Sequence, residues 1–248
     1  MITKTALWAG LIMASAGLAA CGEKTEAPDA ASEKAAPMDN SARIDAVLAG
    51  DHRTEEERAR DAFRHPKETL MFFGMKSTYG DHPELYGDVE LSSLGEGHHI
   101  APEGSADMVV TFRNIHSFMG RDMADFAFAE FFRALKPGGV LGIVEHRADG
   151  SELPHDGSSG YVYTDDVKAM AAAAGFEFDR ASEINANAAD TKDHPFGVWT
   201  LPPVRRSSEV RGQETPGFDR AKYDAIGESD RFTIIFRKPI AADGALLQ

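Results

Sequence analysis

Apolar and polar positions along the second half of the chain predict strands and helices in alternation. Met108–Phe112 is an apolar run after a polar turn, which predicts a buried strand. Apolar residues between Met123 and Leu135 form one broad surface at helical spacing, and Val140–Val144 predicts another buried strand. We further expect a helix at Thr164–Ala174 capped by Thr164, and strands at Phe176–Ile184 and Phe232–Phe236. This alternation predicts an α/β fold with a mainly parallel sheet covered by helices.

The residues before this region predict short helices. Ser41 can cap one helix, and Thr54 with Glu57 forms a capping box for a charged helix that runs to about Phe63. Pro66 is suited to the first position of a third helix, because its ring fixes the backbone angle that a helix needs. The buried side of this third helix is expected to consist of Leu70, Phe72 and Phe73.

The N-terminal residues have the pattern of an export signal. Lys4 supplies a positive charge, and Ala6–Leu18 is an apolar run too short to span a bilayer comfortably. Leu18–Cys21 resembles a bacterial lipobox, which implies cleavage before Cys21 and acylation of that residue. A plain secretory signal with an incidental cysteine is the alternative. Gly22 stands where an aspartate would retain an enterobacterial lipoprotein at the inner membrane. We therefore expect a protein of the bacterial cell envelope, lipid-anchored, facing the periplasm and held in the outer membrane.

Composition and charge narrow the choice of partners. The chain has 248 residues and a formal net charge of −14, which argues against nucleic acid and against electrostatic attachment to anionic lipids. Its single cysteine excludes an intramolecular disulfide. We expect a signal peptide at residues 1–20, a flexible tether at 21–40, N-terminal helices at 41–76, the folded domain at 77–240 and a tail at 241–248.

Polar side chains follow two of the predicted strands at the points where these strands end. Arg113, Asn114 and His116 come after the strand at Met108–Phe112, and Glu145 and His146 come after the strand at Val140–Val144. Carboxyl ends of parallel strands meet at one edge of a sheet, where open α/β sheets build their sites. There, His116 or His146 can take a proton from a nucleophile, Glu145 can orient it, and Arg113 can bind an anionic substrate.

Other interpretations of these residues stay open. The five polar residues can instead form a buried network in which Arg113 pairs with Glu145 and ties the two loops together. Trp199 can wall a pocket, although a core aromatic is the commoner role. A serine hydrolase has less support, because the G-x-S-x-G elbow is missing from the sequence. A metal site could draw on His98, His99, His116, His146 and Glu145. A polar pocket floor could consist of Glu183, Asn185, Asn187 and Asp190, which turn and cap roles explain equally well.

Several segments resemble the second half of class I S-adenosylmethionine (SAM)-dependent methyltransferases. Ser105–Val110 resembles the fourth strand of that family, and Ala134–Leu141 (ALKPGGVL) resembles the turn that leads into the fifth. Tyr163–Phe178 resembles the next helix and strand, and Arg231–Lys238 the seventh strand, which would lie antiparallel beside the fifth. The segments TFRNIHSF, GIVEHRA and GVWTLPP also resemble those of a subfamily of exported bacterial methyltransferases. The resemblance covers roughly residues 89 to 240 and implies a Rossmann-like sheet and SAM as cofactor.

The segment that would cradle SAM in this family is not evident in the sequence. A strand–helix–strand unit needs on the order of 30 residues, and the stretch between Gly74 and the short strand expected at Val89–Leu91 is about half as long. We therefore expect a truncated sheet without its first and second strands, in which Met108–Phe112 is left as an open edge. The remaining cofactor contacts that the resemblance offers are Gly95, Gly97 and Asp107.

The resemblance implies a SAM-dependent methyltransferase that is anchored to the membrane through Cys21 and acts on an unknown small molecule or protein. The alternative is a non-catalytic envelope lipoprotein that retains the methyltransferase fold as a binding or scaffolding module. Binding of SAM would distinguish the two.

Overall fold

The computed structural model describes residues 40–51, 53–74, 92–95, 97–150 and 152–240. All of these lie in one compact unit, Met38–Gln248, which is separate from Met1–Pro37. The predicted signal peptide, Cys21, the tether before residue 40, the strand at Val89–Leu91 and the tail 241–248 lie outside the described residues. None of the helices described is both long and apolar enough to cross a membrane.

The centre of the fold is a five-stranded mixed sheet in the order β1-β2-β5-β4, with β3 paired to β2 off this path. β1 and β2 are parallel, whereas β5 is antiparallel to both of its neighbours. The strands are Ala106–Phe112 (β1), Leu135–Ala148 (β2), Val162–Tyr163 (β3), Glu177–Ser182 (β4) and Arg231–Arg237 (β5). The predicted α/β class is confirmed, as is the antiparallel pairing of the last strand beside β2.

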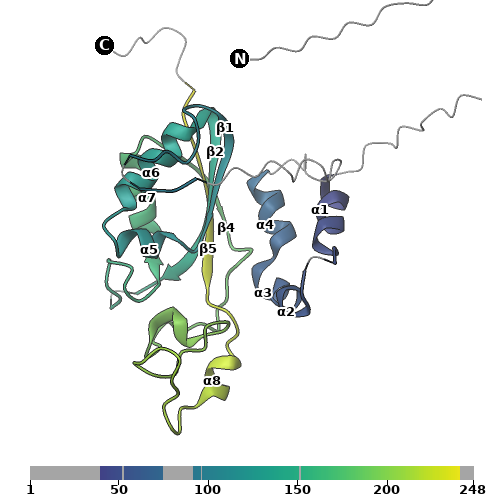
Figure 1. The fold of residues 1–248 in the computed structure, drawn as a ribbon, viewed down its shortest axis with the longest axis vertical. Helices are drawn as coiled ribbons and strands as arrows, with labels where there is room; N and C mark the ends of the chain where they lie inside the picture. The colour runs from purple at the N-terminus through teal and green to yellow at the C-terminus, as the bar shows by residue number, and fades with distance from the viewer. Residues whose placement is uncertain (1–39, 52, 75–91, 96, 151, 241–248) are drawn as a thin grey trace, which may run out of the picture. The chain divides into compact units, whose positions relative to one another are not determined.

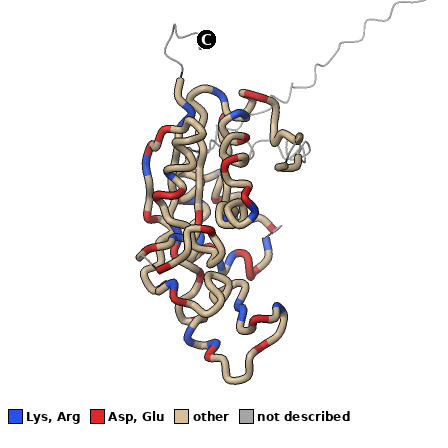
Figure 2. Tube along the Cα trace, turned by 90° about the vertical axis from the view of Figure 1, so that its left-hand side faces the viewer, with Lys and Arg blue, Asp and Glu red and all other residues tan. Residues whose placement is uncertain are grey.

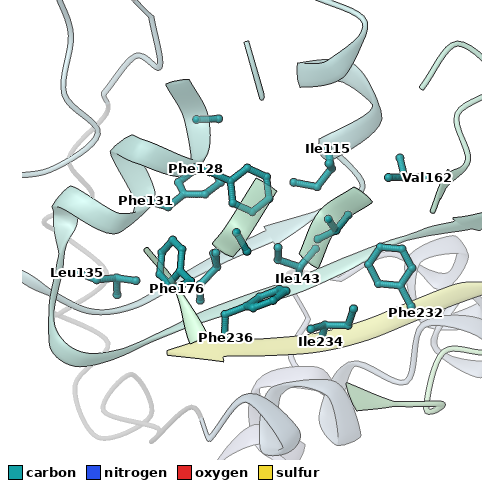
Figure 3. Packing of buried hydrophobic residues seen from close by; sticks show 14 residues of the cluster. Ile115, Phe128, Phe131, Leu135, Ile143, Val162, Phe176, Phe232, Ile234 and Phe236 are labelled. Carbon is teal, nitrogen blue, oxygen red and sulfur yellow. The ribbon is translucent and has the colours of Figure 1, made fainter. Parts of the chain in front are cut away.

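One face of the sheet is covered by α5 (Ile115–Met119), α6 (Ala124–Ala134) and α7 (Thr164–Ala173). The main apolar core lies between these helices and the sheet, because both contribute a continuous apolar face that is removed from water. Figure 3 shows this packing, with the labelled side chains Ile115, Phe128, Phe131, Leu135, Ile143, Val162, Phe176, Phe232, Ile234 and Phe236.

The turn that follows α6, within the first residues of β2, has the backbone that its glycines predict. Gly138 has a φ of 78°, a left-handed conformation that glycine adopts without a steric penalty. A Cβ atom at Gly139 would lie 2.8 Å from the carbonyl oxygen of Lys136, so any other residue would force the turn to open. The sequence Lys136–Gly139 therefore reverses the chain tightly and feeds α6 directly into the central strand.

The opposite face of the sheet is covered by the N-terminal helices, which Figure 1 shows in purple and blue. Phe73, at the end of the helix nearest the sheet, packs with Val144 and Ile235, and its ring lies directly over Gly142. These helices are α1 (Asn40–Leu48), α2 (Glu55–Ala59), α3 (Asp61–Arg64) and α4 (Pro66–Phe73). Burial of the apolar side of α4 is what attaches this helical layer to the sheet.

The helix ends differ from the prediction in three places. The capping box of Thr54 and Glu57 is present as predicted, but its helix stops at Ala59 and a second helix follows. Ser41 lies inside α1, which begins one residue earlier. Thr164 is the first residue of α7, so the cap position belongs to Tyr163, which makes no side-chain cap bond. Pro66 begins α4 as predicted.

Beyond β4 the chain forms a loop-rich segment at one end of the sheet, green to yellow in Figure 1. It contains a short 3-10 helix, Gly197–Thr200, and helix α8, Arg220–Asp224, before β5 returns into the sheet.

The outer edge of β1 has no strand partner among the described residues. Residues 66–73, which precede the region where the resemblance places two further strands, are helical. We expect the Val89–Leu91 strand to move in beside this edge, or a partner to cover it. Residues 89–91 lie outside the described residues, so this stays a prediction.

The contact between Phe73 and Gly142 makes a stability prediction. A Cβ atom at Gly142 would lie 2.9 Å from the Phe73 ring, closer than side chains pack. We expect Gly142→Ala to lower the free energy of unfolding by about 1–3 kcal/mol, measured by urea denaturation.

The matched control is Gly95→Ala, since a Cβ atom there meets nothing within 4 Å. Equal stability of Gly142→Ala and the unsubstituted protein would show that α4 does not need this close approach.

Candidate functional site

The carboxyl ends of β1 and β2 form a rim at one edge of the sheet, because the two strands are parallel and paired in register. Arg113, Asn114 and His116 follow β1, as predicted. Glu145 and His146 were expected just after their strand, but β2 continues to Ala148 and both lie within it. The structure brings His116, Glu145 and His146 together and leaves Arg113 and Asn114 in other surroundings.

Glu145 is fully buried and bonds to groups from two elements. Its Oε2 accepts hydrogen bonds from the backbone N–H of Ile115, at 2.6 Å, and of His116, at 3.4 Å. Its Oε1 accepts one from the backbone N–H of His146 at 2.9 Å. The first amides of a helix have no partner within the helix and carry partial positive charge. Glu145 therefore caps α5 from a neighbouring strand and gains the donors that a buried carboxylate requires.

His116 is oriented by the same carboxylate. Its Nδ1 lies 3.1 Å from Glu145 Oε1, and its ring packs edge-on against Trp199 with the ring centroids 6.0 Å apart. When Nδ1 carries the proton and donates to the carboxylate, Nε2 of the neutral ring is left as an acceptor. This is the arrangement by which a carboxylate prepares an imidazole to take up a proton.

His146 is the second imidazole of the cluster, and its ring centroid lies 5.6 Å from that of His116. Its Nδ1 lies 2.5 Å from the Oγ of Ser229, which is also buried. Burial lowers the pKa of His146 well below its ordinary value of 6.5, and the positive charges of Arg231 and Arg113 and the His116 ring lower it further. His146 is therefore a neutral imidazole at neutral pH.

His116, Glu145 and His146 together have the residue types of a metal site, each offering a ligand atom within 4.8 Å of the others. Imidazole and carboxylate are ligands that zinc takes in proteins. However, both oxygens of Glu145 already accept backbone N–H groups, and Nδ1 of His146 is engaged by Ser229. A metal would have to compete with these bonds, so the cluster is better suited to holding and moving a proton.

Arg113 does not pair with Glu145, so that part of the predicted network is wrong. Its backbone N–H donates to the carbonyl of Val144 at 2.7 Å, and its φ of 58° is a left-handed angle that few non-glycine residues adopt. Its side chain lines a cavity of about 320 Å³ beside α4. Burial and the charge of Arg231 lower the pKa of the Arg113 guanidinium. The left-handed turn at the end of β1 thus accompanies a separation of Arg113 from the histidines.

Asn114 is exposed and occupies the position before α5. Its side chain is 3.4 Å from the hydroxyl of Thr111, and its carbonyl accepts the backbone N–H groups of Ser117 and Phe118. Asn114 is therefore explained by the start of α5, with Glu145 supplying the cap bond that Asn114 does not make.

The residues predicted as a pocket floor do not share one pocket, and each takes part in different interactions. Asn185 lies beside the 320 Å³ cavity, whereas Asp190 belongs to a buried network with Tyr161 and His194. Burial alone would raise the pKa of Asp190, but the hydrogen bond from His194 and those from backbone amides outweigh it and lower the pKa. Glu183 pairs with Arg147 at the surface. Only Asn185 of this set lines that cavity.

Trp199 stands between the histidine cluster and solvent. It lines a second cavity, of about 770 Å³, formed by the loop residues 199–214, and its ring contacts His116. The predicted role as a pocket wall is consistent with this position.

The predicted contacts to a cofactor lie away from the rim. Gly95 forms an isolated bridge with His98, and His99 bonds to Glu130 on α6 at 3.2 Å. This segment packs near the C-terminal half of α6, from which β2 begins. His98 and His99 are therefore not part of the histidine cluster, and Gly95 and its neighbour Gly97 do not reach the site.

Asp107 is at the opposite end of β1 from the rim. It is paired with Lys136 at 2.7 Å and its side chain is 84% exposed. The rise of a strand places it about 20 Å from Arg113. The predicted cofactor contact at Asp107 therefore cannot belong to a site at the carboxyl ends of the strands.

Arg231 and Ser229 reach the rim, although the sequence reasoning did not select them. Both precede or begin β5, whose antiparallel direction places its start beside the ends of β1 and β2. The antiparallel direction expected for this strand was the sequence feature that could have indicated these two residues. Arg64 also lines the smaller cavity, through the packing of the N-terminal helices, which no sequence pattern indicated.

No model of a known protein family and no curated protein matches this chain. Solved structures with a similar backbone path include the (4+2)-cyclase SpnF, with a TM-score of 0.42 at 18% identity over 69% of this chain and 64% of the cyclase. A SAM-dependent methyltransferase from Methanosarcina mazei has a TM-score of 0.33 at 17% identity over 57% of this chain and 63% of its own. A SAM-dependent methyltransferase from Aquifex aeolicus has a TM-score of 0.32 at 17% identity, over 53% of this chain and 60% of its own. This chain spans less than two thirds of each.

The buried imidazole of His146 makes stability depend on pH. Its pKa is depressed in the folded state, so its contribution is present above 6.5 and is lost as pH falls below that value, where the unfolded chain takes up a proton. Below pH 6.5 we expect the free energy of unfolding to fall less steeply in His146→Gln than in the unsubstituted protein. The slopes of unfolding free energy against pH differ between the two proteins by about 1.4 kcal/mol per pH unit. Urea denaturation between pH 7.5 and 5.5 measures both slopes.

His98→Gln is the control, since His98 is exposed and belongs to no part of the cluster. Identical slopes for His146→Gln and His98→Gln would contradict the assignment of a neutral buried His146.

Proposed function

We propose that this protein is a cell-envelope lipoprotein of the SAM-dependent methyltransferase family in which part of the cofactor site has been lost. The observation that carries the proposal is the strand order β1-β2-β5-β4 with β5 antiparallel, which is the order that the resemblance of residues 89 to 240 implies. The glycine turn at the start of β2, which is the most specific part of that resemblance, supports the proposal. A fold alone does not determine an activity, so the site must decide what remains of it.

The described residues do not fit SAM. The sulfonium of SAM is a cation, and the cavity at the rim is lined by the guanidinium groups of Arg64, Arg113 and Arg231. Ribose hydroxyls are held by a carboxylate in nucleotide-binding folds of this type. Two carboxylates described at the rim, Glu145 and Glu228, are already bound, the first by backbone amides and the second by arginines.

The part of the site that does fit a reaction is the substrate side. His116 has its Nδ1 fixed by Glu145, so its Nε2 is in position to take a proton from a hydroxyl or amine nucleophile. The buried carboxylate would then stabilise the imidazolium. Neutral His146 beside it adds no positive charge that would oppose this proton uptake. General base catalysis is the role we assign to His116.

A second candidate is a non-catalytic envelope protein that retains the fold for binding or scaffolding. The specific observation in its favour is that Glu145 caps α5, so the cluster has a structural role without any reaction. The proposed location outside the cytoplasm agrees with this candidate, because SAM is not expected to be supplied there.

Titration calorimetry with SAM and with S-adenosylhomocysteine tests whether the cofactor site has been lost. With the full-length chain in detergent we expect no heat beyond dilution for either compound. The physical reasons are the positive charge of the rim cavity and the stretch between Gly74 and Val89, which is too short to supply the strand–helix–strand unit that cradles SAM.

A SAM-binding methyltransferase measured in the same detergent is the positive control. Saturable binding of either compound at one site per chain would refute the loss of the cofactor site. It would restore methyl transfer, with His116 as base, as the function.

Lipidation is tested by labelling cells with an alkyne analogue of palmitate. We expect the unsubstituted protein to incorporate the label and to fractionate with the outer membrane, because Cys21 follows a lipobox and Gly22 permits sorting. Cys21→Ser should lose the label.

Gly22→Asp is the matched variant, which should keep the label and remain in the inner membrane of an enterobacterial host. Labelling that survives Cys21→Ser would rule out the lipobox as the acylation site.

A further inference from the structure

The cavity of about 320 Å³ beside α4 has a positively charged side. Arg64, Arg113 and Arg231 all line it. The carboxylate that serves these arginines is Glu228, which accepts hydrogen bonds from Arg231 and, at 3.0 Å, from Nε of Arg64. Glu228 also pairs with Arg60 at 2.7 Å. Three guanidinium groups, those of Arg60, Arg64 and Arg231, thus bond to one carboxylate, and Arg113 is a fourth guanidinium at the same cavity. The cavity therefore has an excess of positive charge.

Arg113 is the cation in this group without a bonded partner, because the carboxylates of Glu228 and Glu145 act on it only through longer-range attraction. Its side chain makes no hydrogen bond or ion pair with any residue that the structure describes. The lowered pKa of its guanidinium follows from burial and from the charge of Arg231. Its left-handed backbone is a strained conformation of the sort that persists where the surrounding structure requires it. An unpaired cation facing other cations is destabilising until an anion joins it.

Two further donors at the cavity are buried and unused. Nη2 of Arg64 and Nε of Arg231 have no hydrogen-bond partner in the described part of the chain, and Arg231 is only 2% exposed. Asn185, which is 3% exposed, also has an amide oxygen without a partner. Buried polar groups are nearly always paired, so these unpaired atoms call for a ligand or ordered water.

The remaining walls of the cavity are apolar. Pro66 and Leu70 of α4 face Phe112 and Val144 of the sheet across it. Phe112 is 37% exposed, although it lies at the end of a core strand. The volume is at the lower end of the range for small-molecule sites and exceeds what a bare oxyanion fills.

We propose that this cavity binds a small molecule with one oxyanion group, a carboxylate or a phosphate, on a short apolar body. The forked donors of Arg113, Arg64 and Arg231 match the geometry of an oxyanion. The apolar walls receive the rest of the molecule, whose burial adds to the binding. Figure 2 shows acidic and basic residues mixed along the described trace, so the arginine cluster, not a general basic surface, selects the anion. The site requires neither SAM nor lipidation.

Calorimetry with the full-length chain in detergent tests the site with hexanoate and phenyl phosphate, which differ in the anionic group. We expect at least one of the two to bind with one molecule per chain. The ligand that binds more tightly shows whether the site prefers a carboxylate or a phosphate. Acetate and inorganic phosphate bind at least tenfold more weakly, because they lack the apolar body. Hexylamine, which has the apolar body and the opposite charge, does not bind.

Arg113→Gln weakens binding about tenfold to a hundredfold, the effect of losing a charged hydrogen-bond donor. Because Arg113 holds no other group, this variant keeps or raises the melting temperature, so weaker binding is not unfolding. Leu70→Phe fills the apolar part of the cavity and weakens the binding of hexanoate without changing any charge. Arg121→Gln, an exposed arginine elsewhere, is the control and leaves binding unchanged.

The proposal is overturned if neither anion binds, if hexylamine binds as well as hexanoate, or if Arg113→Gln and Arg121→Gln bind equally. These results are independent of the SAM titration, since a chain that binds SAM at a separate site can still bind hexanoate or fail to.

Discussion

The buried carboxylate of Glu145 fixes the geometry of the whole rim, because its two oxygens tie β2 to the first turn of α5. A charge in the core is tolerated only when donors surround it, and here three backbone amides and an imidazole do so. Those bonds set where α5 starts and which way His116 points. His146 follows in the same strand, and its burial keeps it neutral. The position of each imidazole is thus a consequence of where one negative charge is stabilised.

Much of the fold was predictable, since the informative patterns are local. The apolar run Met108–Phe112 predicts a strand, and the glycines of Lys136–Gly139 predict a turn. Neither prediction requires knowledge of tertiary contacts. The grouping of His116 with Glu145 also followed from the sequence, because parallel neighbouring strands end at one edge. The helix ends were less predictable, since Ser41 and Thr164 are equally acceptable inside a helix.

The smaller cavity could not be predicted, because it depends on packing between distant segments. Arg64, the last residue of α3, meets Arg231 through the carboxylate of Glu228. The next helix, α4, lies on the sheet where Phe73 packs over Gly142, and a residue without a side chain adds nothing to a periodic pattern. Arg113 was selected from its place after β1, but its left-handed backbone directs it away from Glu145. Conformation at one residue decided between an internal ion pair and a surface open to a ligand.

The place of β5 in the sheet has a consequence for how the chain acquires its structure. β5 spans Arg231–Arg237, close to the end of the sequence, yet it lies between β2 and β4. A chain that emerges from a ribosome or a translocation channel N-terminus first therefore has β4 before it has the strand that joins β4 to the sheet. The core on both faces stays open until β5 has passed. Completion of the sheet is thus coupled to the synthesis of β5, and a product that stops short of Arg231 exposes both faces to water.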